Sequence, residues 1–356
     1  MMKQKEKTRE RLLAQGNAYP EWQIQDIFKY LYQSAFGCEH LVSSREDAAE
    51  RIRREYASCS HRAQAHIDAL DGAYSRVHLS CLQDGMDAET LAGLFVASAK
   101  TETAGREALE SKLAIAAELV RTGELAFDPD EFDKTVLAWR AQDYPSVHHS
   151  DAFRTCYQPS YRVIANDYLP FLPLFSEIDK KCRVGRVIVA IEGGSASGKS
   201  TLGDLLQSVY DCTLFHMDDF FLRPEQRTPE RYAEIGGNVD RERFLEEVLI
   251  PLRAGKAVDY RRFDCKTMTV QAPIRVQPSQ LTVIEGAYSM HPDLASYYDL
   301  SVFLDVAPML QRKRIEKRNS PPVAERFYRE WIPLETRYFA HMRVKERCDL
   351  CVTIDE

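Results

Sequence analysis

The sequence predicts an α/β fold for residues 185–356, with a parallel sheet flanked by helices, preceded by a mainly α-helical domain over residues 1–180. Three observations lead to this expectation. A chain of 356 residues exceeds one ordinary hydrophobic core, so two domains are expected. After residue 185, continuous apolar runs alternate with amphipathic segments, as in parallel sheets covered on both faces. Before residue 180, apolar residues recur mainly at helical spacing.

The first half contains the helical segments. Apolar residues at i, i+3 and i+4 predict helices over residues 26–36, 47–56, 87–99, 106–122 and 128–140. Gly123 suits the position after a helix end, and Pro129 suits a first helical turn. Residues 74–81 alternate and predict a short strand. The proline-punctuated run 168–174, followed by the basic residues of 180–183, is expected to connect the two domains.

The second half contains the strands. Apolar runs predict strands over residues 187–192, 213–216, 281–285, 300–306 and 350–354. Amphipathic segments between them predict helices over residues 202–210, 241–253 and 309–317. A sheet of this kind binds ligands at the carboxyl ends of its strands.

Composition limits the class of partner and the compartment. The net charge of -7 argues against a nucleic-acid backbone as the main partner. Residues 1–10 are charged throughout, and no window approaches 18 apolar residues, so neither a signal peptide nor a membrane segment is expected. Nine cysteines without disulfide-like spacing suit a reducing cytoplasm, and the lone pair Cys348 and Cys351 lacks the further ligands of a zinc site. The sequence leaves open whether the chain forms a homo-oligomer.

One loop carries the strongest functional signal. The predicted strand 187–192 runs directly into the P-loop pattern Gly193-x-x-x-x-Gly198-Lys199-Ser200, and a predicted helix follows. Glycines let successive N–H groups turn toward phosphate oxygens, and the helix adds its positive N-terminal end. Lys199 is expected to reach the β- and γ-phosphates and Ser200 to bind Mg²⁺. The residues expected to hold the nucleotide are Gly193, Gly194, Ser195, Ala196, Ser197, Gly198, Lys199, Ser200 and Thr201.

Charged residues follow this loop at places that suit phosphoryl transfer. Asp218 and Asp219 come directly after the strand 213–216, and Glu285 ends the strand 281–285. The position of Asp218 beside the P-loop favours a role as a base or metal ligand over that of an ordinary carboxylate at a strand end. Asp219 is better suited to cap a turn or the start of a helix. Arg314 and Arg318 lie on one helix face and could hold transferring charge. No Asn-Lys-x-Asp motif typical of GTPases is present.

These residues together resemble the uridine kinase and phosphoribulokinase-like group of P-loop kinases over about residues 185–356. The matching segments are 193–200, 217–221, 238–240, 260–264 and 283–286, with the arginines Arg312, Arg314 and Arg318. The resemblance implies that Asp218 is the general base and that Ser200 and Glu285 bind Mg²⁺. It also implies that Asp240, Tyr260, Phe263 and Asp264 face the acceptor, and that a mobile arginine-bearing lid lies near 312–326.

The chain departs from the nucleoside kinases of this group in two segments. Their base-reading segment supplies a histidine, and no histidine occurs here between His216 and His291. The segment Asn319-Ser-Pro-Pro322 replaces a longer arginine-containing lid stretch. A kinase is still expected, while the identity of its substrate stays open.

The first half has polar residues of its own. They are Gly37-Cys-Glu-His40, Arg76 with His78, His148-His-Ser150, and Tyr157-x-Pro-x-Tyr161-Arg162. This half resembles an uncharacterised bacterial domain with the pattern Gln33-x-x-Phe36-Gly37-x-x-His40-Leu41, which implies no activity. Histidines with Arg76 and Arg162 would suit an anionic small molecule, although histidines on helices are more often structural. An active site, a regulatory module and a substrate-delivering module remain alternatives.

The sequence therefore predicts an ATP- and Mg²⁺-dependent kinase of a small molecule with a free hydroxyl. Asp218, Lys199, Arg314 and Arg318 are the expected catalytic residues. A nucleoside is the leading acceptor, with a sugar, a pantothenate-like or a glycerate-like alcohol as the alternative. A second hypothesis is an ATP-binding sensor that controls the first domain without transferring phosphate. Preference for ATP or GTP is not readable from the sequence.

Overall fold

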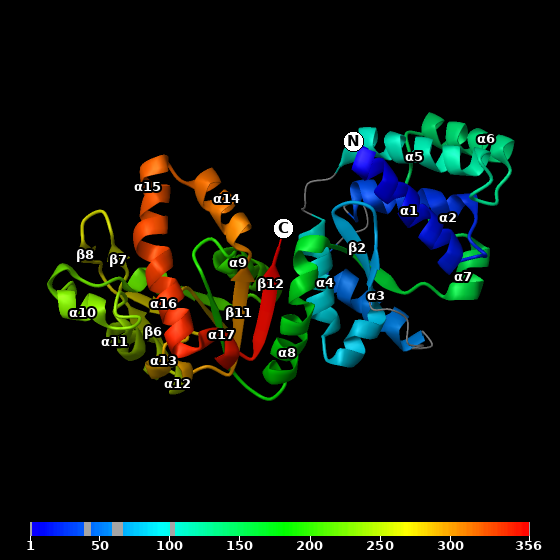
Figure 1. The fold of residues 1–356 in the computed structure, drawn as a ribbon. Helices are drawn as coiled ribbons and strands as arrows, with labels where there is room; N and C mark the ends of the chain where they lie inside the picture. Colours follow the sequence, from blue (N-terminus) through cyan, green and yellow to red (C-terminus); the bar gives the residue numbers. More distant parts are fainter. Residues whose placement is uncertain (1, 39–43, 59–66, 100–103, 356) are drawn as a thin grey trace. The chain divides into compact units, whose positions relative to one another are not determined.

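The computed structural model describes residues 2–38, 44–58, 67–99 and 104–355 of the chain (Figure 1). Contacts within the chain divide it into two units, residues 1–169 and 170–356. The division falls inside the expected connector, before the helix α8 (Leu172–Cys182) that packs on strands of the second unit. No helix in the described ranges is both long and apolar enough to cross a membrane.

Unit 1 is mainly helical, as predicted. Its helices are α1 (Met2–Ala18), α2 (Ile24–Phe36), α3 (Arg45–Ser58), α4 (Ala88–Ser98), α5 (Gly105–Arg121), α6 (Pro129–Ala141) and α7 (Asp151–Tyr157), with 3-10 turns at Leu79–Asp84 and Asn166–Phe171. The α6 start follows local chemistry, because Asp128 accepts a hydrogen bond from the Glu131 N–H and Pro129 fills the first turn.

Unit 1 also contains an antiparallel sheet in the order β1-β2-β3, formed by Ile67–Ala69, Tyr74–His78 and Tyr161–Ala165. The predicted strand over residues 74–81 is present as β2, but its last three residues begin a 3-10 turn. All five residues of β2 are buried. The sheet brings β3, from the end of the unit, beside β2, so Tyr161 lies opposite His78 in the register.

Unit 2 confirms the predicted α/β fold. Its parallel sheet has the order β12-β11-β4-β10-β5 and the bounds Leu350–Ile354, Leu300–Val306, Val187–Gly193, Leu281–Glu285 and Thr213–His216. Between strands lie α9 (Lys199–Tyr210), α10 (Pro229–Ala233), α11 (Arg241–Phe244), α12 (Ile250–Arg253), α13 (Pro292–Ala295), α14 (Pro308–Arg318), α15 (Pro321–Arg326), α16 (Ile332–Met342) and α17 (Val344–Arg347).

Helices cover both faces of this sheet (Figure 1). On one face, α9 packs against β4, β5 and β10, while α8 packs against β4 and β11. On the other, Ile188 and Ala190 of β4 share a core with Phe244, Val248 and Tyr338. Burial of both faces explains why the strands read as continuous apolar runs in the sequence.

Short elements complete unit 2 near the strand ends. Two-stranded sheets pair β6 (Val258–Tyr260) with β9 (Ile274–Val276) and β7 (Phe263–Asp264) with β8 (Thr269–Val270). Short 3-10 turns, η4 and η5, follow β5 at Met217–Phe220 and Pro224–Gln226. The expected helix over 241–253 is present, but a π turn, Leu245–Leu249, joins α11 to α12. A second π turn, Phe327–Trp331, precedes α16.

Candidate functional site

The P-loop lies between the end of β4 and the start of α9. Gly193 and Gly198 have φ angles of +151° and +102°, a region that favours glycine. A Cβ on Gly193 would lie 2.7 Å from the Leu304 carbonyl oxygen, so a larger residue would push the loop off β11. The sequence pattern therefore reflects real steric limits in this turn.

The loop encloses polar groups suited to phosphate. The Lys199 ammonium donates to the carbonyl oxygens of Gly193 and Gly194, at 2.9 Å each, and so spans the loop. Ser197 Oγ is buried and has no hydrogen-bond partner among the described residues. The first turn of α9 also leaves N–H groups without partners inside the helix. This cradle of donors and one lysine fits the phosphates of a nucleotide.

A carboxylate lies beside the start of α9. Glu285 ends β10, next to His216 of β5 in the strand register. Its Oε1 accepts from Ser200 Oγ at 3.2 Å and from His216 Nδ1 at 2.6 Å. The hydrogen bond to the carboxylate raises the pKa of His216 above its ordinary value, against the effect of burial.

Ser200 and Glu285 fit a magnesium site that is completed by phosphate. Magnesium commonly binds through one or two protein oxygen ligands together with substrate phosphates and water. Within the described ranges, no group of three or more His, Cys, Asp or Glu side chains could hold a metal. A metal at the P-loop would therefore take its remaining ligands from nucleotide and water.

Asp218 stands just beyond β5, at the start of η4. Its side chain is accessible to solvent. The surrounding protein nevertheless removes enough water to raise the pKa of Asp218 above its ordinary value, and Glu285 adds to this while Lys199 opposes it. An accessible carboxylate of raised pKa suits proton transfer from a hydroxyl. The neighbouring Asp219 forms an ion pair with Arg262, at 3.2 Å, which suits a structural role.

The two predicted lid arginines have different surroundings. Arg314 of α14 donates to the carbonyl oxygens of Ala196 and Ser197, at 3.3 Å each, so it contacts the P-loop directly. The exposed guanidinium of Arg318 lies over the Phe327 ring, 5.8 Å from its centroid. Helical spacing predicted that both arginines lie on one helix face. In the structure Arg314 contacts the P-loop, whereas Arg318 packs on Phe327.

The residues expected to face the acceptor lie around η4. Tyr260 is 3% exposed and packs edge-on against Phe215, with a centroid distance of 5.1 Å. Phe263 is 6% exposed. Asp264 accepts from the Lys266 N–H at 2.8 Å and so closes a turn. Tyr260 is therefore part of the hydrophobic core shared with Phe215 and Phe220, and Phe263 is buried beside η4.

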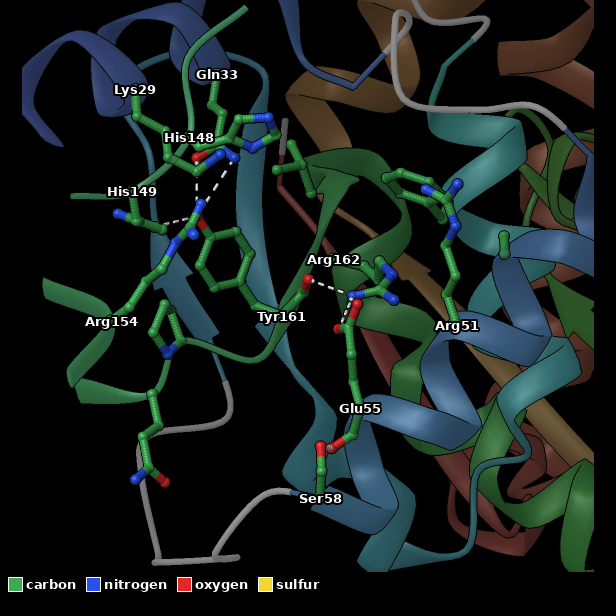
Figure 2. A pocket seen from close by; sticks show the side chains of 15 residues that line it. Lys29, Gln33, Arg51, Glu55, Ser58, His148, His149, Arg154, Tyr161 and Arg162 are labelled. Atoms are coloured by element: carbon green, nitrogen blue, oxygen red, sulfur yellow. Dashed lines mark hydrogen bonds and ion pairs between the residues drawn. The ribbon is translucent and has the colours of Figure 1, made fainter. Parts of the chain in front are cut away.

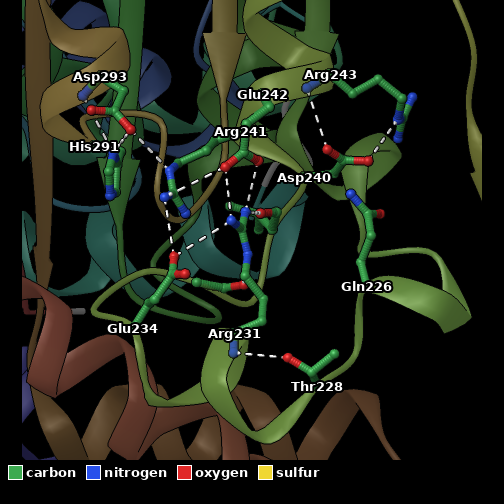
Figure 3. A network of polar contacts seen from close by, with 12 residues as sticks. Gln226, Thr228, Arg231, Glu234, Asp240, Arg241, Glu242, Arg243, His291 and Asp293 are labelled. Carbon is green, nitrogen blue, oxygen red and sulfur yellow. Dashed lines mark hydrogen bonds and ion pairs between the residues drawn. The ribbon is translucent and has the colours of Figure 1, made fainter.

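Asp240 is buried at the start of α11, where Figure 3 shows it in a polar network. It caps the helix by accepting from the Arg243 N–H at 3.3 Å, and it also accepts from Arg243 Nε at 3.3 Å. Its contacts are thus with the protein. In the same network Arg231 donates to both oxygens of Glu242, at 2.7 Å each, and Arg241 pairs with Asp293 at 3.0 Å.

Two glutamates that the sequence analysis did not single out as functional shape the site. Glu192, fully buried at the end of β4, accepts from the N–H groups of Tyr288 and Met290 and from the Tyr338 hydroxyl, at 3.0 to 3.1 Å. It therefore ties the chain after Glu285 to β4. Burial raises the pKa of Glu192 to about 7. A carboxylate inside an otherwise apolar strand was the available signal.

Glu335 of α16 reaches the P-loop from far along the chain. Its two oxygens accept from Ser195 N at 2.8 Å and from Ser195 Oγ at 2.6 Å. Gln311 of α14 donates to the Ser195 carbonyl at 2.8 Å. Residues C-terminal to β11 thus hold the outer turn of the P-loop in place.

The polar residues predicted in unit 1 also gather. His149 contacts Tyr161, and the Arg76 guanidinium lies over the Tyr161 ring, 4.7 Å from its centroid. His78 pairs with Asp68 at 3.0 Å. His40 and Leu41 of the predicted pattern lie outside the described residues.

Comparisons with known proteins agree with the C-terminal site. Residues 188–318 match the model of the Phosphoribulokinase / Uridine kinase family. Uridine kinase-like protein 4 of Arabidopsis thaliana is 27% identical over 141 residues, which are 37% of this chain and 30% of the relative. The match therefore spans under a third of that relative's length.

Solved structures also resemble part of the chain. A protein described as a possible uridine kinase from Bacillus stearothermophilus is 21% identical, with a TM-score of 0.38, over 50% of this chain and 98% of the other. Shikimate kinase from Aquifex aeolicus is 16% identical, with a TM-score of 0.24, over 47% of this chain and 85% of the other. The family match itself identifies residues 188–318 as a region similar to P-loop kinases.

Proposed function

We propose, from the match of residues 188–318 to the phosphoribulokinase / uridine kinase family, that unit 2 transfers a phosphoryl group from ATP to a hydroxyl of a small metabolite. The observation that carries this proposal is the grouping of Lys199, Ser200, Glu285 and Asp218 at the carboxyl ends of three neighbouring strands. Such a site combines hydrogen-bond donors for phosphate, a pair of side chains for a metal and a carboxylate that can act as a base.

Each side chain has a part in this reaction. When bound, Mg²⁺ and ATP supply the phosphoryl group and neutralise its charge. The P-loop amides and Lys199 hold the phosphates, and Ser200 with Glu285 positions the metal. Asp218 takes the proton from the attacking hydroxyl, and its raised pKa brings its basicity closer to that task. Arg314, already at the P-loop, stabilises charge on the transferring group.

A nucleoside is the leading acceptor, because residues 188–318 match a family whose description includes uridine kinase. A sugar or another alcohol is the alternative. Phe263 is buried beside η4, and no histidine lies between His216 and His291 to contact a nucleoside base.

The test is ADP formation by the full chain with ATP and Mg²⁺ across ribonucleosides, sugars and other hydroxyl metabolites. We expect one acceptor to raise ADP release well above the rate without acceptor, and the acceptor to appear as its phosphate ester. ADP release that no acceptor changes, together with tight ATP binding, would contradict the proposal and favour a nucleotide sensor.

A further inference from the structure

Unit 1 contains a pocket of about 560 Å³ that the proposed kinase reaction does not use. Its walls come from α2, α3, α7, the strand β3 and the segment before α7 (Figure 2). A volume of this size accommodates a molecule as large as a sugar phosphate or a nucleotide. The pocket lies wholly within unit 1, so its contents can be argued independently of unit 2.

Positive charge dominates the lining. Four cationic side chains line the pocket, Lys29, Arg51, Arg154 and Arg162, against the one carboxylate of Glu55. Glu55 is already engaged, because Arg162 Nη1 lies 2.7 Å from its Oε2. The lining therefore has more cations than its own carboxylate can neutralise, a balance that attracts an anionic ligand.

Within the described parts of the chain, three of the cations have no carboxylate closer than 4.0 Å. Among the residues that the structure describes, no ion pair forms with Arg51, and the carboxylate nearest to Arg154 is Asp151, at 4.0 Å. Lys29 Nζ donates to the carbonyl oxygen of Val147 at 3.1 Å. Burial lowers the pKa of Lys29 to about 8, with Arg76 and then Arg154 as further causes. Placing these cations together costs free energy, which a bound anion would offset.

A fixed hydroxyl points into the same pocket. His149 is 7% exposed and stacks on Phe153, and its Nδ1 lies 2.8 Å from the Asp26 carboxylate. Because a carboxylate only accepts, Nδ1 carries the proton, and Nε2 accepts from the Tyr161 hydroxyl at 2.7 Å. The hydroxyl proton is thereby engaged, and the lone pairs of the phenol oxygen face other donors.

Asp26 is itself held in position. It accepts from Ser150 N at 3.0 Å, from Ser150 Oγ at 2.6 Å and from Gln23 N at 2.9 Å. These hydrogen bonds hold the pKa of Asp26 below its ordinary value although burial opposes them. The chain from Asp26 through His149 to Tyr161 is therefore preorganised, a feature of binding and reacting sites more than of ordinary surfaces.

Figure 2 shows how these groups share the pocket. Lys29, His149 and Arg154 surround the hydroxyl end of Tyr161, while Arg51 and Arg162 lie toward Glu55 of α3. The end of the pocket that is lined by Lys29 and Arg154 therefore offers two cations beside the hydroxyl of Tyr161. Phosphate is the biological anion whose oxygens such a set satisfies best, since each cation can form a charge-assisted hydrogen bond.

We propose that this pocket of unit 1 binds a phosphate monoester, with its phosphate held by Lys29 and Arg154 beside Tyr161 and its body extending toward Arg51. A sugar phosphate and a nucleoside monophosphate share this chemistry. Binding there does not depend on the kinase reaction, because none of these residues belongs to unit 2.

The test is isothermal titration of the full chain with ribose 5-phosphate, uridine 5′-monophosphate and inorganic phosphate, and with ribose and uridine as unphosphorylated controls. We expect at least one phosphate ester to bind with an affinity that depends on Arg154 and Arg51, and its parent compound to show no binding that depends on these arginines. Loss of a charge-assisted hydrogen bond, in Arg154→Ala or Arg51→Ala, should weaken binding about tenfold or more. Tyr161→Phe, which keeps the ring, should weaken it by about three- to tenfold.

Two controls assign the binding to unit 1. Arg54→Ala removes an exposed arginine of α3 that does not line the pocket, and it should leave the affinity unchanged. Lys199→Ala disables the P-loop of unit 2 and should also leave it unchanged. Binding that disappears in Lys199→Ala but survives Arg154→Ala and Arg51→Ala would overturn the inference. So would the absence of binding by every phosphorylated probe at millimolar concentration.

Discussion

At the scale of single residues, the metal-binding pair gives the sharpest prediction for unit 2. Glu285→Gln removes the carboxylate charge that faces Ser200 Oγ at 3.2 Å while keeping the side-chain volume. We expect the Mg²⁺ concentration for half-maximal activity to rise about 10- to 100-fold. Activity measured across a magnesium titration checks this.

The matched control for this change is Glu246→Gln, which neutralises an exposed glutamate of unit 2. Its magnesium curve should coincide with that of the wild-type chain. An unshifted magnesium requirement in Glu285→Gln would remove Glu285 from the proposed metal site.

Strand ends explain which site residues were predictable. Ser200 and Asp218 follow predicted apolar strands and Glu285 ends one, and parallel strands bring their carboxyl ends to one edge. Glu335 gave no such signal, since its contact with Ser195 joins residues 140 positions apart. Long-range contacts of this kind follow from how helices dock, which neither a local motif nor helical periodicity encodes.

At the scale of elements, the turn after β10 determines where η4 lies. Gly286 has a φ of +145°, and a Cβ there would lie 2.5 Å from Met217 Cβ and 3.2 Å from Met217 N. Gly286→Ala must therefore strain the turn or push away the residue before Asp218. We expect the unfolding free energy of unit 2 to fall by about 1–3 kcal/mol, and phosphoryl transfer to fall with it. Urea denaturation in a Trp22→Phe, Trp139→Phe background, which leaves Trp331 as the remaining tryptophan, measures the loss.

Gly185→Ala serves as the matched control, because a Cβ there meets no atom within 4 Å. This change should leave unfolding and activity close to wild type. Equal stability of the two glycine variants would show that the contact with Met217 does not constrain the turn.

Element length determined how much of the fold was predictable. The strands β5, β10, β11 and β12 have the bounds expected from the sequence, because each is a short, mainly apolar run with a clear start and end. Strands of two or three residues, such as β7 and β8, are too short to show periodicity. The π turn before α12 was also missed, and helical periodicity continues through it.

At the scale of the whole molecule, the two units should respond differently to acid. Burial lowers the pKa of His149 in unit 1 to about 4, with Arg76 and Lys29 contributing and Asp26 opposing. The folded state thus favours neutral His149, so its contribution is present above the unfolded pKa of about 6.5 and is lost as the pH falls toward 4. Between pH 7 and pH 5, unit 1 should lose about 2 kcal/mol of unfolding free energy from this group.

The measurement uses Trp331→Phe as the background, which leaves Trp22 and Trp139 of unit 1 as the tryptophans. Urea unfolding at pH 7 and pH 5 then reports on unit 1. His149→Gln should flatten the pH dependence, whereas His148→Gln, which changes an exposed neighbour, should preserve it. An unchanged slope in His149→Gln would show that another group carries the acid sensitivity.

The pocket of unit 1 could be predicted from the sequence only in part. The sequence indicated that its histidines and arginines suit an anion, but Lys29, Arg51 and Arg154 come from three helices whose packing no motif predicts. The P-loop of unit 2, by contrast, is contiguous in the chain, so the sequence alone predicted its geometry.

The central claim for the whole molecule is that unit 2 uses Asp218 to activate a hydroxyl. Its most direct test follows the labelled γ-phosphate of ATP into the acceptor, with the wild-type chain, Asp218→Asn and the exposed control Asp204→Asn measured in parallel. The account predicts transfer by the wild type and the control, and a loss of about 10²–10⁴-fold in Asp218→Asn with ATP binding near normal. Transfer at the wild-type rate by Asp218→Asn, or no transfer to any acceptor by the wild type, would contradict it.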